Sequence, residues 1–223
     1  MTKHRDLFTA RQLVALTTFR DLVPDARERI VADGGDIEYS GALATHLAFL
    51  VSKLADIASL LCRWEPVAQC PRGVFSRQAI PMVWDFAEGN PFGESSGSWG
   101  VLVSNQRRSL RSPFLSVATV GTVNVSNLDA TAAVDALEGV LICTDPPYYD
   151  NVPYAGLSDF FYVWLRRGLA DVHPNLFSTL LTPKARELVA DQFRFGGSRA
   201  AARRFFEDGM TRFFTRACGA IQT

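Results

Sequence analysis

The tetrapeptide Asp145-Pro146-Pro147-Tyr148 combines residue types that could act on the amino group of a nucleobase. Such an amine is a poor nucleophile, because its lone pair is delocalised into the ring. The carboxylate of Asp145 and the backbone carbonyl of Pro146 could each accept one amine hydrogen, which would stabilise the charge that develops during attack. The prolines fix φ and remove backbone donors, so the loop would be stiff. The four residues are therefore candidate catalytic residues.

The segment before the tetrapeptide would have to position it. Residues 139–144 read Gly-Val-Leu-Ile-Cys-Thr, and this short apolar run predicts a buried strand. Ligands of open α/β sheets bind at the carboxyl ends of such strands. Tyr148 would offer its ring to a base flipped out of the helix, and S-adenosylmethionine would be the methyl donor. A rigid turn after a strand is the alternative explanation of the Asp-Pro-Pro sequence.

A longer stretch around the tetrapeptide resembles a known family. Residues 145–167 read DPPYYDNVPYAGLSDFFYVWLRR, which is similar to adenine-specific DNA methylases whose full-length members also carry a zinc ribbon, some of them linked to phage defence. The resemblance extends through residues 7–13 and 78–88 and covers most of the chain. It implies methylation of adenine in DNA with S-adenosylmethionine as the cofactor.

Three residues are candidates for cofactor binding. The resemblance implies contacts at Phe8 and Thr9. A second apolar run, residues 116–125, predicts one or two strands, and Asp129 follows it. In this class of fold, an acidic residue after the strand that precedes the catalytic one often contacts the adenine amine of the cofactor. The alternative role of Asp129 is an N-cap for a helix over residues 130–137.

The sequence also departs from the family. Ala10 stands where the family's Phe-Thr-Pro segment has proline, and Gly156 stands where aspartate is common. No segment of the type Asp-Pro-Phe-x-Gly-x-Gly, which holds the cofactor in such enzymes, is present in the sequence. We therefore expect an internal or truncated piece of a larger enzyme, or one half of a split enzyme, that is inactive alone. The remainder of that enzyme is then an expected partner.

The loop after the tetrapeptide is rich in aromatic and amide side chains. Tyr149, Asn151 and Tyr154 are candidate substrate-binding residues, because they offer stacking surfaces and hydrogen-bonding groups. Ser158 is a candidate N-cap for a helix over residues 159–167, whose aromatic side chains would pack in the core.

Charge gives DNA binding limited support. The formal net charge is zero, but residues 151–223 hold 10 basic and 6 acidic side chains. Five arginines near the C-terminus have nearly helical spacing and could contact phosphates; they are Arg199, Arg203, Arg204, Arg212 and Arg216. A solvated helix face paired with Glu207 and Asp208 explains them equally well.

The N-terminal half is expected to be helical. Thr9 is a suitable N-cap for a first helix. Residues 41–62 carry a leucine seam at steps of four and three, which predicts a core helix. Its expected polar face consists of His46, Ser52, Lys53, Asp56 and Ser59.

Residues 63–100 are expected to be irregular, and a short helix is expected over residues 100–110. Arg77, Gln78, Trp84 and Asp85 combine polar groups with a stacking surface. This favours a loop that faces the target, and surface packing around the tryptophan is the alternative.

The four cysteines do not predict a metal site. Cys62, Cys70, Cys143 and Cys218 form no Cys-x-x-Cys pair, and Cys143 is expected to be a core residue of the predicted strand. No signal peptide is expected, because the start, Met1 to Asp6, leads into an amphipathic segment without an apolar stretch of sufficient length. No membrane span is expected, because Lys53 and Asp56 interrupt the most apolar helix. These features indicate the cytoplasm.

Together, these patterns predict an α/β protein, a partial Rossmann-like methyltransferase core with a helical N-terminal portion. The expected division is a mainly helical part with a target-facing loop, residues 1–110, and a partial catalytic core, residues 111–223. The expected function is amino-methylation of DNA; adenine is favoured, cytosine stays open, and an RNA amine is a weaker option. The alternative from another class is a non-catalytic DNA-binding module or a subunit of a split methyltransferase.

Overall fold

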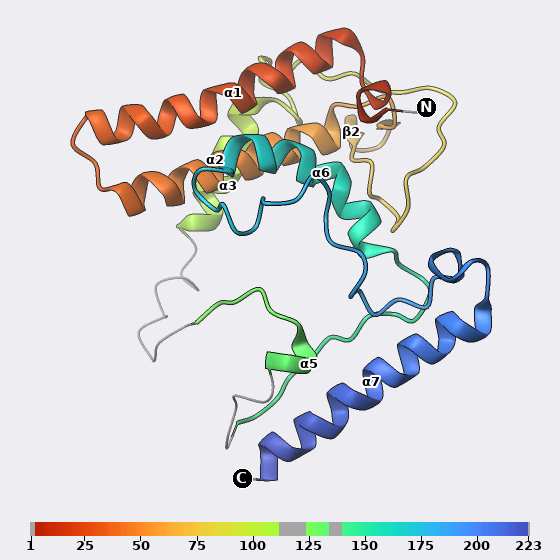
Figure 1. Cartoon of the computed structure of the whole chain (residues 1–223). Coiled ribbons are helices and arrows are strands. Elements are labelled where there is room, and N and C mark those ends of the chain that lie inside the picture. The colour runs from red at the N-terminus through yellow and green to blue at the C-terminus, as the bar shows by residue number, and fades with distance from the viewer. Residues whose placement is uncertain (1–2, 112–123, 134–139, 223) are drawn as a thin grey trace. The chain divides into compact units, whose positions relative to one another are not determined.

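The computed structural model describes residues 3–111, 124–133 and 140–222, and within these residues the chain is mostly helical (Figure 1). Contacts between residues divide the chain into two units. The first comprises Met1–Val120 and Leu157–Thr182, and the second comprises Gly121–Gly156 and Pro183–Thr223.

Two long helices begin the first unit. A short 3-10 helix, η1 (His4–Leu7), precedes α1 (Ala10–Ala32), and α2 (Ile37–Ile57) follows after a short connection. Figure 1 shows α1 and α2 running side by side in opposite directions. Thr9 caps α1 as predicted: its hydroxyl accepts a hydrogen bond from the backbone N–H of Gln12, and the Gln12 side chain accepts one from Thr9.

The second long helix is buried on more than one face. The leucine seam lies in the core as predicted, with Leu54 only 1% exposed. The predicted polar face is wrong in part, because Ser52, Asp56 and Ser59 are also buried. Asp56 tolerates burial because Lys53 forms an ion pair with its carboxylate at 2.8 Å.

The segment after α2 contains a small hairpin. Strands β1 (Arg63–Glu65) and β2 (Cys70–Arg72) pair in antiparallel fashion, with Trp64 opposite Pro71. The hairpin contradicts part of the irregular segment predicted over residues 63–100, whereas residues 73–98 form no helix or strand, as predicted. Helix α3 (Trp99–Leu110) confirms the short helix expected there, and Ser98 caps its start.

Helix α6 (Tyr154–Leu169) carries aromatic residues into the core of the first unit. Phe160 and Trp164 are buried and pack against Phe8, with the Phe8 and Trp164 rings 5.5 Å apart. The helix begins at Tyr154, so the predicted N-cap at Ser158 is wrong.

The second unit contains helices and irregular segments. Its described elements are α5 (Ala130–Ala133), the 3-10 helix η3 (Gln192–Phe195) and α7 (Arg199–Gln222). The five arginines predicted to share a helix lie on α7 and are exposed. Arg203 forms an ion pair with Glu207 at 2.7 Å, so part of this face is internally paired.

The predicted α/β fold with a Rossmann-like core is wrong for the described residues. Their only sheet is the two-stranded antiparallel hairpin. Residues 140–148 form no strand, and both Leu141 and the predicted core residue Cys143 are exposed. A strand needs a neighbouring backbone to pair its N–H and C=O groups, and residues 140–148 have no such neighbour among the described residues. Of the predicted strand at 116–125, residues 116–123 lie outside the described residues.

No helix in the described part of the chain combines the length and apolar character needed to cross a bilayer.

Candidate functional site

The loop that carries the tetrapeptide is a series of tight turns in the second unit. The backbone N–H of Tyr149 donates to the carbonyl of Pro147 at 3.0 Å, and that of Asn151 donates to the carbonyl of Tyr148 at 3.0 Å. Tyr149 adopts a φ of 56°, which lies in the left-handed region. Residues other than glycine, asparagine and aspartate rarely occupy this region. Together with the two prolines, these turns give the loop a defined shape.

Tyr149 anchors this loop to the rest of the unit. Its carbonyl oxygen accepts a hydrogen bond from the backbone N–H of Ala190 at 2.9 Å. Its ring meets the Phe206 ring of α7 edge-on, with centroids 5.1 Å apart. Packing on both sides thus offsets the cost of the left-handed conformation.

A pocket of about 710 Å³ lies beside the loop and brings together several of the predicted residues. Asp145, Pro146 and Pro147 line it together with Asp129 and Tyr154. The remaining lining residues also belong to the second unit and are Asn127, Leu128, Ala130, Thr131, Thr144, Ala155, Pro183, Arg186, Glu187, Leu188, Met210 and Phe213. Such a volume suits a small organic ligand or a single nucleotide. Most of the lining residues are exposed, so the pocket is an open one.

Asp129 occupies the start of α5. Its carboxylate accepts hydrogen bonds from the hydroxyl of Thr131 at 2.7 Å and from the Thr131 backbone N–H at 2.9 Å. These bonds, helped by the positive charges of Arg186 and Arg212, hold the pKa of Asp129 below its ordinary value. The carboxylate therefore stays ionised at the edge of the pocket and also acts as the N-cap that the sequence offered as an alternative.

Two more carboxylates line the same pocket and differ in their partners. Glu187 accepts a hydrogen bond from the backbone N–H of Ala155 at 2.8 Å, at the start of α6. The Asp145 carboxylate is exposed and, among the described residues, has no hydrogen-bond or ion-pair partner. It can therefore accept a hydrogen bond from a ligand without first breaking one.

The predicted catalytic residue Tyr148 and the predicted substrate residues Tyr149 and Asn151 are not among the residues that line this pocket. Tyr148 is 48% exposed, so its ring is accessible to a ligand. Asn151 is also exposed. Tyr149 lines a separate pocket of about 380 Å³ with Asp150, Gln192 and Arg199, among others.

Phe8 and Thr9 belong to the first unit and have structural roles there. Phe8 is 5% exposed, and its ring packs on Phe160 and Trp164. Thr9 caps α1, and its hydroxyl also donates to Glu88 at 3.1 Å. Their contact with a cofactor stays a prediction.

Sequence reasoning missed Arg186, Glu187, Met210 and Phe213 as lining residues. They lie between about 40 and 70 residues after the tetrapeptide and share no motif. No short-range sequence pattern identifies these residues, because only the three-dimensional fold of the second unit brings them to the pocket.

The described residues contain no group of three or more histidine, cysteine, aspartate or glutamate side chains that could hold a metal ion. The four cysteines are free thiols.

Comparison of the chain with protein-family models, with curated proteins and with solved structures finds no match.

Proposed function

We propose that this chain carries the base-accepting site of an S-adenosylmethionine-dependent amino-methyltransferase that acts on DNA, with adenine as the favoured base. One observation carries the proposal. Asp145, Pro146 and Pro147 form a stiff loop that lines a pocket of about 710 Å³ together with the ionised Asp129. A carboxylate and a proline-fixed carbonyl in adjacent positions are the acceptors that an exocyclic amine requires.

The two acceptors have distinct tasks in this proposal. The carboxylate of Asp145 accepts one amine hydrogen, and the backbone carbonyl of Pro146 accepts the other. Both bonds strengthen as positive charge develops on the nitrogen, so they stabilise the transition state more than the bound substrate. Asp145 has no competing partner among the described residues, which supports this role. The cytosine amine presents the same two hydrogens and is the second candidate.

Aromatic side chains would hold the base. Tyr148 is half-exposed and borders Pro147, so its ring can stack on a base that has left the duplex. Tyr154 lines the pocket itself and is 38% exposed.

The chemistry of the pocket suits part of the cofactor. S-adenosylmethionine would supply an electrophilic methyl group on a positively charged sulfur. Asp129, Asp145 and Glu187 place three carboxylates in the lining, against the single positive charge of Arg186, and this excess of negative charge favours a cation. Phe213 and Leu188 offer apolar surface for an adenosyl ring. Asp129 is the residue that we propose to accept a hydrogen bond from the adenine amine of the cofactor.

Two features indicate that further protein is needed for activity. The sequence lacks the glycine-rich turn that lets a backbone approach the cofactor closely. The lining of the pocket is mostly exposed, whereas cofactors of this size are usually held in largely enclosed sites. We therefore propose that a second polypeptide segment, from the same enzyme or from a partner subunit, completes the cofactor site. We also place the protein in the cytoplasm, where free thiols persist.

The proposal is tested by methyl transfer from isotope-labelled S-adenosylmethionine. The chain is co-expressed with the coding sequences next to its own, and the purified complex is incubated with duplex DNA. The DNA is then digested to nucleosides and analysed by mass spectrometry. We expect label in N6-methyladenine. Label in N4-methylcytosine would change the substrate base, and absence of label from both would contradict the proposal.

A further inference from the structure

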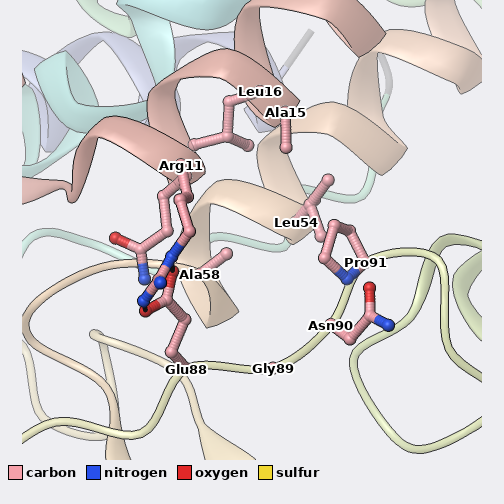
Figure 2. A pocket seen from close by; sticks show the side chains of 10 residues that line it. Arg11, Ala15, Leu16, Leu54, Ala58, Glu88, Gly89, Asn90 and Pro91 are labelled. Atoms are coloured by element: carbon pink, nitrogen blue, oxygen red, sulfur yellow. Dashed lines mark hydrogen bonds and ion pairs between the residues drawn. The ribbon is translucent and has the colours of Figure 1, made fainter.

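Arg11 and Arg194 each bridge to another segment of their own unit, and they do so by different means. Figure 2 shows Arg11 of α1 meeting Glu88 among the residues that line a pocket of about 380 Å³ in the first unit. The Arg11 side chain is 84% exposed, and exposed ion pairs of this kind contribute little to stability. Arg194, in the second unit, is half-buried and bonds to backbone carbonyls.

Arg194 joins two carbonyls of the segment formed by residues 185–190. One terminal nitrogen of its guanidinium donates to the carbonyl of Glu187 at 2.7 Å, and the other donates to the carbonyl of Ala185 at 2.9 Å. The planar guanidinium carries its donors in a rigid fork, which suits paired bonds of this kind. One side chain therefore holds the segment at two points.

Arg194 is itself held by η3 and α7. Asp191 caps η3 by accepting a hydrogen bond from the Phe193 N–H at 2.9 Å, and the helix ends at Gly196, whose φ is 62°. The guanidinium carbon of Arg194 lies 5.3 Å from the centroid of the Phe205 ring of α7, within the range of a cation–π contact. These contacts fix the side chain that holds segment 185–190.

Segment 185–190 is in turn bound to the loop that carries the tetrapeptide. The Ala190 N–H donates to the Tyr149 carbonyl at 2.9 Å, and the Glu187 carboxylate accepts a hydrogen bond from the Ala155 N–H at 2.8 Å. Both bonds hold the chain shortly after the tetrapeptide. Residues 186–188 of the same segment line the pocket of about 710 Å³ beside that loop.

Adjacent residues of α7 contact the two parts of this arrangement. Phe205 lies beside Arg194, and Phe206 meets the Tyr149 ring edge-on with centroids 5.1 Å apart. Loss of the Arg194 side chain would release segment 185–190 and leave the contact of Phe206 with the loop in place. The loop would then stay folded but lose its fixed position beside the pocket.

We propose that Arg194 is a positioning residue for the methyl transfer proposed above. Through segment 185–190, it fixes the loop that presents the Asp145 carboxylate and the Pro146 carbonyl to the base. Arg194 does not line the pocket, so it acts through other residues. The inference rests on the proposed function for its chemical consequence, whereas the contacts themselves can be tested without any reaction.

The first test measures amide hydrogen exchange in the purified full chain by nuclear magnetic resonance. Arg194→Ala is compared with wild type and with two controls, Arg11→Ala and Arg204→Ala, the second an exposed arginine of α7. We expect Arg194→Ala to speed exchange at the Ala190 and Ala155 N–H groups at least about tenfold, and both controls to leave these rates unchanged. Faster exchange throughout the second unit, including α7, would mark a general loss of stability and overturn the proposal.

A lysine variant tests the paired bonds. Arg194→Lys keeps the positive charge but lacks two parallel donors in one plane, so we expect its exchange rates to resemble those of Arg194→Ala. Wild-type rates in the lysine variant would show that the fork is not required and would overturn the proposal.

The second test is kinetic and uses the co-expressed complex. We expect Arg194→Ala to lower kcat for methyl transfer at least about tenfold, because small displacements of catalytic groups slow the chemical step. We expect KM for duplex DNA to stay within about twofold of wild type, since Arg194 does not contact the base.

The proposal is overturned if Ala190 and Ala155 exchange at wild-type rates in Arg194→Ala, or if kcat is unchanged. Absence of transfer by the wild-type complex would instead contradict the proposed function, and the exchange rates would still decide whether Arg194 holds the loop.

Discussion

The backbone N–H of Tyr149 donates to the carbonyl oxygen of Pro147 at 3.0 Å, and Tyr149 itself lies in the left-handed region with a φ of 56°. This bond closes a three-residue turn centred on Tyr148. The turn presents Tyr148 next to the prolines that line the pocket, while the Tyr149 ring faces Phe206. The conformation of one residue thus separates a candidate base-stacking ring from a structural one.

The conformation of Tyr149 predicts a difference between two substitutions. Both Tyr149→Asn and Tyr149→Val remove the ring contact with Phe206, but asparagine tolerates the left-handed region and a β-branched side chain does not. We expect Tyr149→Val to lower the free energy of unfolding by about 1 kcal/mol more than Tyr149→Asn. Urea unfolding followed by circular dichroism measures the difference, and equal losses would show that the left-handed conformation is not maintained.

Tyr148 is predicted to contribute to binding by stacking. Tyr148→Ala is expected to lose about 1–3 kcal/mol of affinity for DNA with an unpaired target base, whereas Tyr148→Phe keeps the ring and most of the affinity. Fluorescence anisotropy with labelled DNA measures both. If the phenylalanine variant binds as poorly as the alanine variant, the hydroxyl is the group that matters and the stacking role is wrong.

His4 makes the stability of the first unit depend on pH. Burial, only partly opposed by the hydrogen bond from its ring to the Phe160 carbonyl, holds the pKa of His4 below the ordinary 6.5. The unfolded chain therefore takes up the proton at a higher pH than the folded chain does. As a result, the free energy of unfolding is highest with respect to His4 above pH 6.5, the ordinary pKa of histidine, and it falls as the pH drops below that value.

We expect the free energy of unfolding to fall between about pH 7 and pH 5, and to fall less steeply in His4→Gln, which keeps a donor for Phe160 but cannot titrate in this range. Thermal unfolding at a series of pH values compares the two proteins. Identical slopes would mean that other groups cause the dependence.

Sequence patterns that span only a few residues predicted the helices well. Thr9 is followed three residues later by Gln12, and this pattern forms the capping box at α1 without help from distant residues. The cap of α6 could not be found in this way. The backbone N–H of Ala155 bonds to Glu187, 32 residues farther along the chain, so the helix begins four residues before Ser158.

Non-local contacts also explain the errors in burial and strand prediction. Asp56, on the predicted polar face of α2, is buried, and the segment carrying Val74 lies against it, with the Val74 N–H donating to the Asp56 carbonyl at 2.9 Å. Residues 140–144 have the composition of a strand, but composition cannot supply the neighbouring backbone that a strand must pair with. The tetrapeptide could be recognised from the sequence, whereas Arg186, Glu187 and Phe213 could not, because only the fold brings them to it.

The open cofactor site predicts weak binding by the chain alone. Without a glycine-rich turn, and with Asp129 and Asp145 exposed, the chain should bind S-adenosylmethionine weakly or not at all and should not methylate DNA by itself. Calorimetric titration measures the affinity. A micromolar dissociation constant, about −8 kcal/mol, would show that these residues already enclose the cofactor.

The role of Asp145 is the central claim, and methyl transfer by the co-expressed complex tests it most directly. We compare wild type, Asp145→Ala and Asp150→Ala for the rate of methyl transfer and for affinity for duplex DNA. Asp150→Ala is the control, because Asp150 is a nearby carboxylate that does not line the pocket of about 710 Å³. We expect Asp145→Ala to reduce the rate by at least about a hundredfold with little change in affinity, because the carboxylate acts in the transition state, and Asp150→Ala to stay near wild type. A near-normal rate in Asp145→Ala would contradict the proposed function.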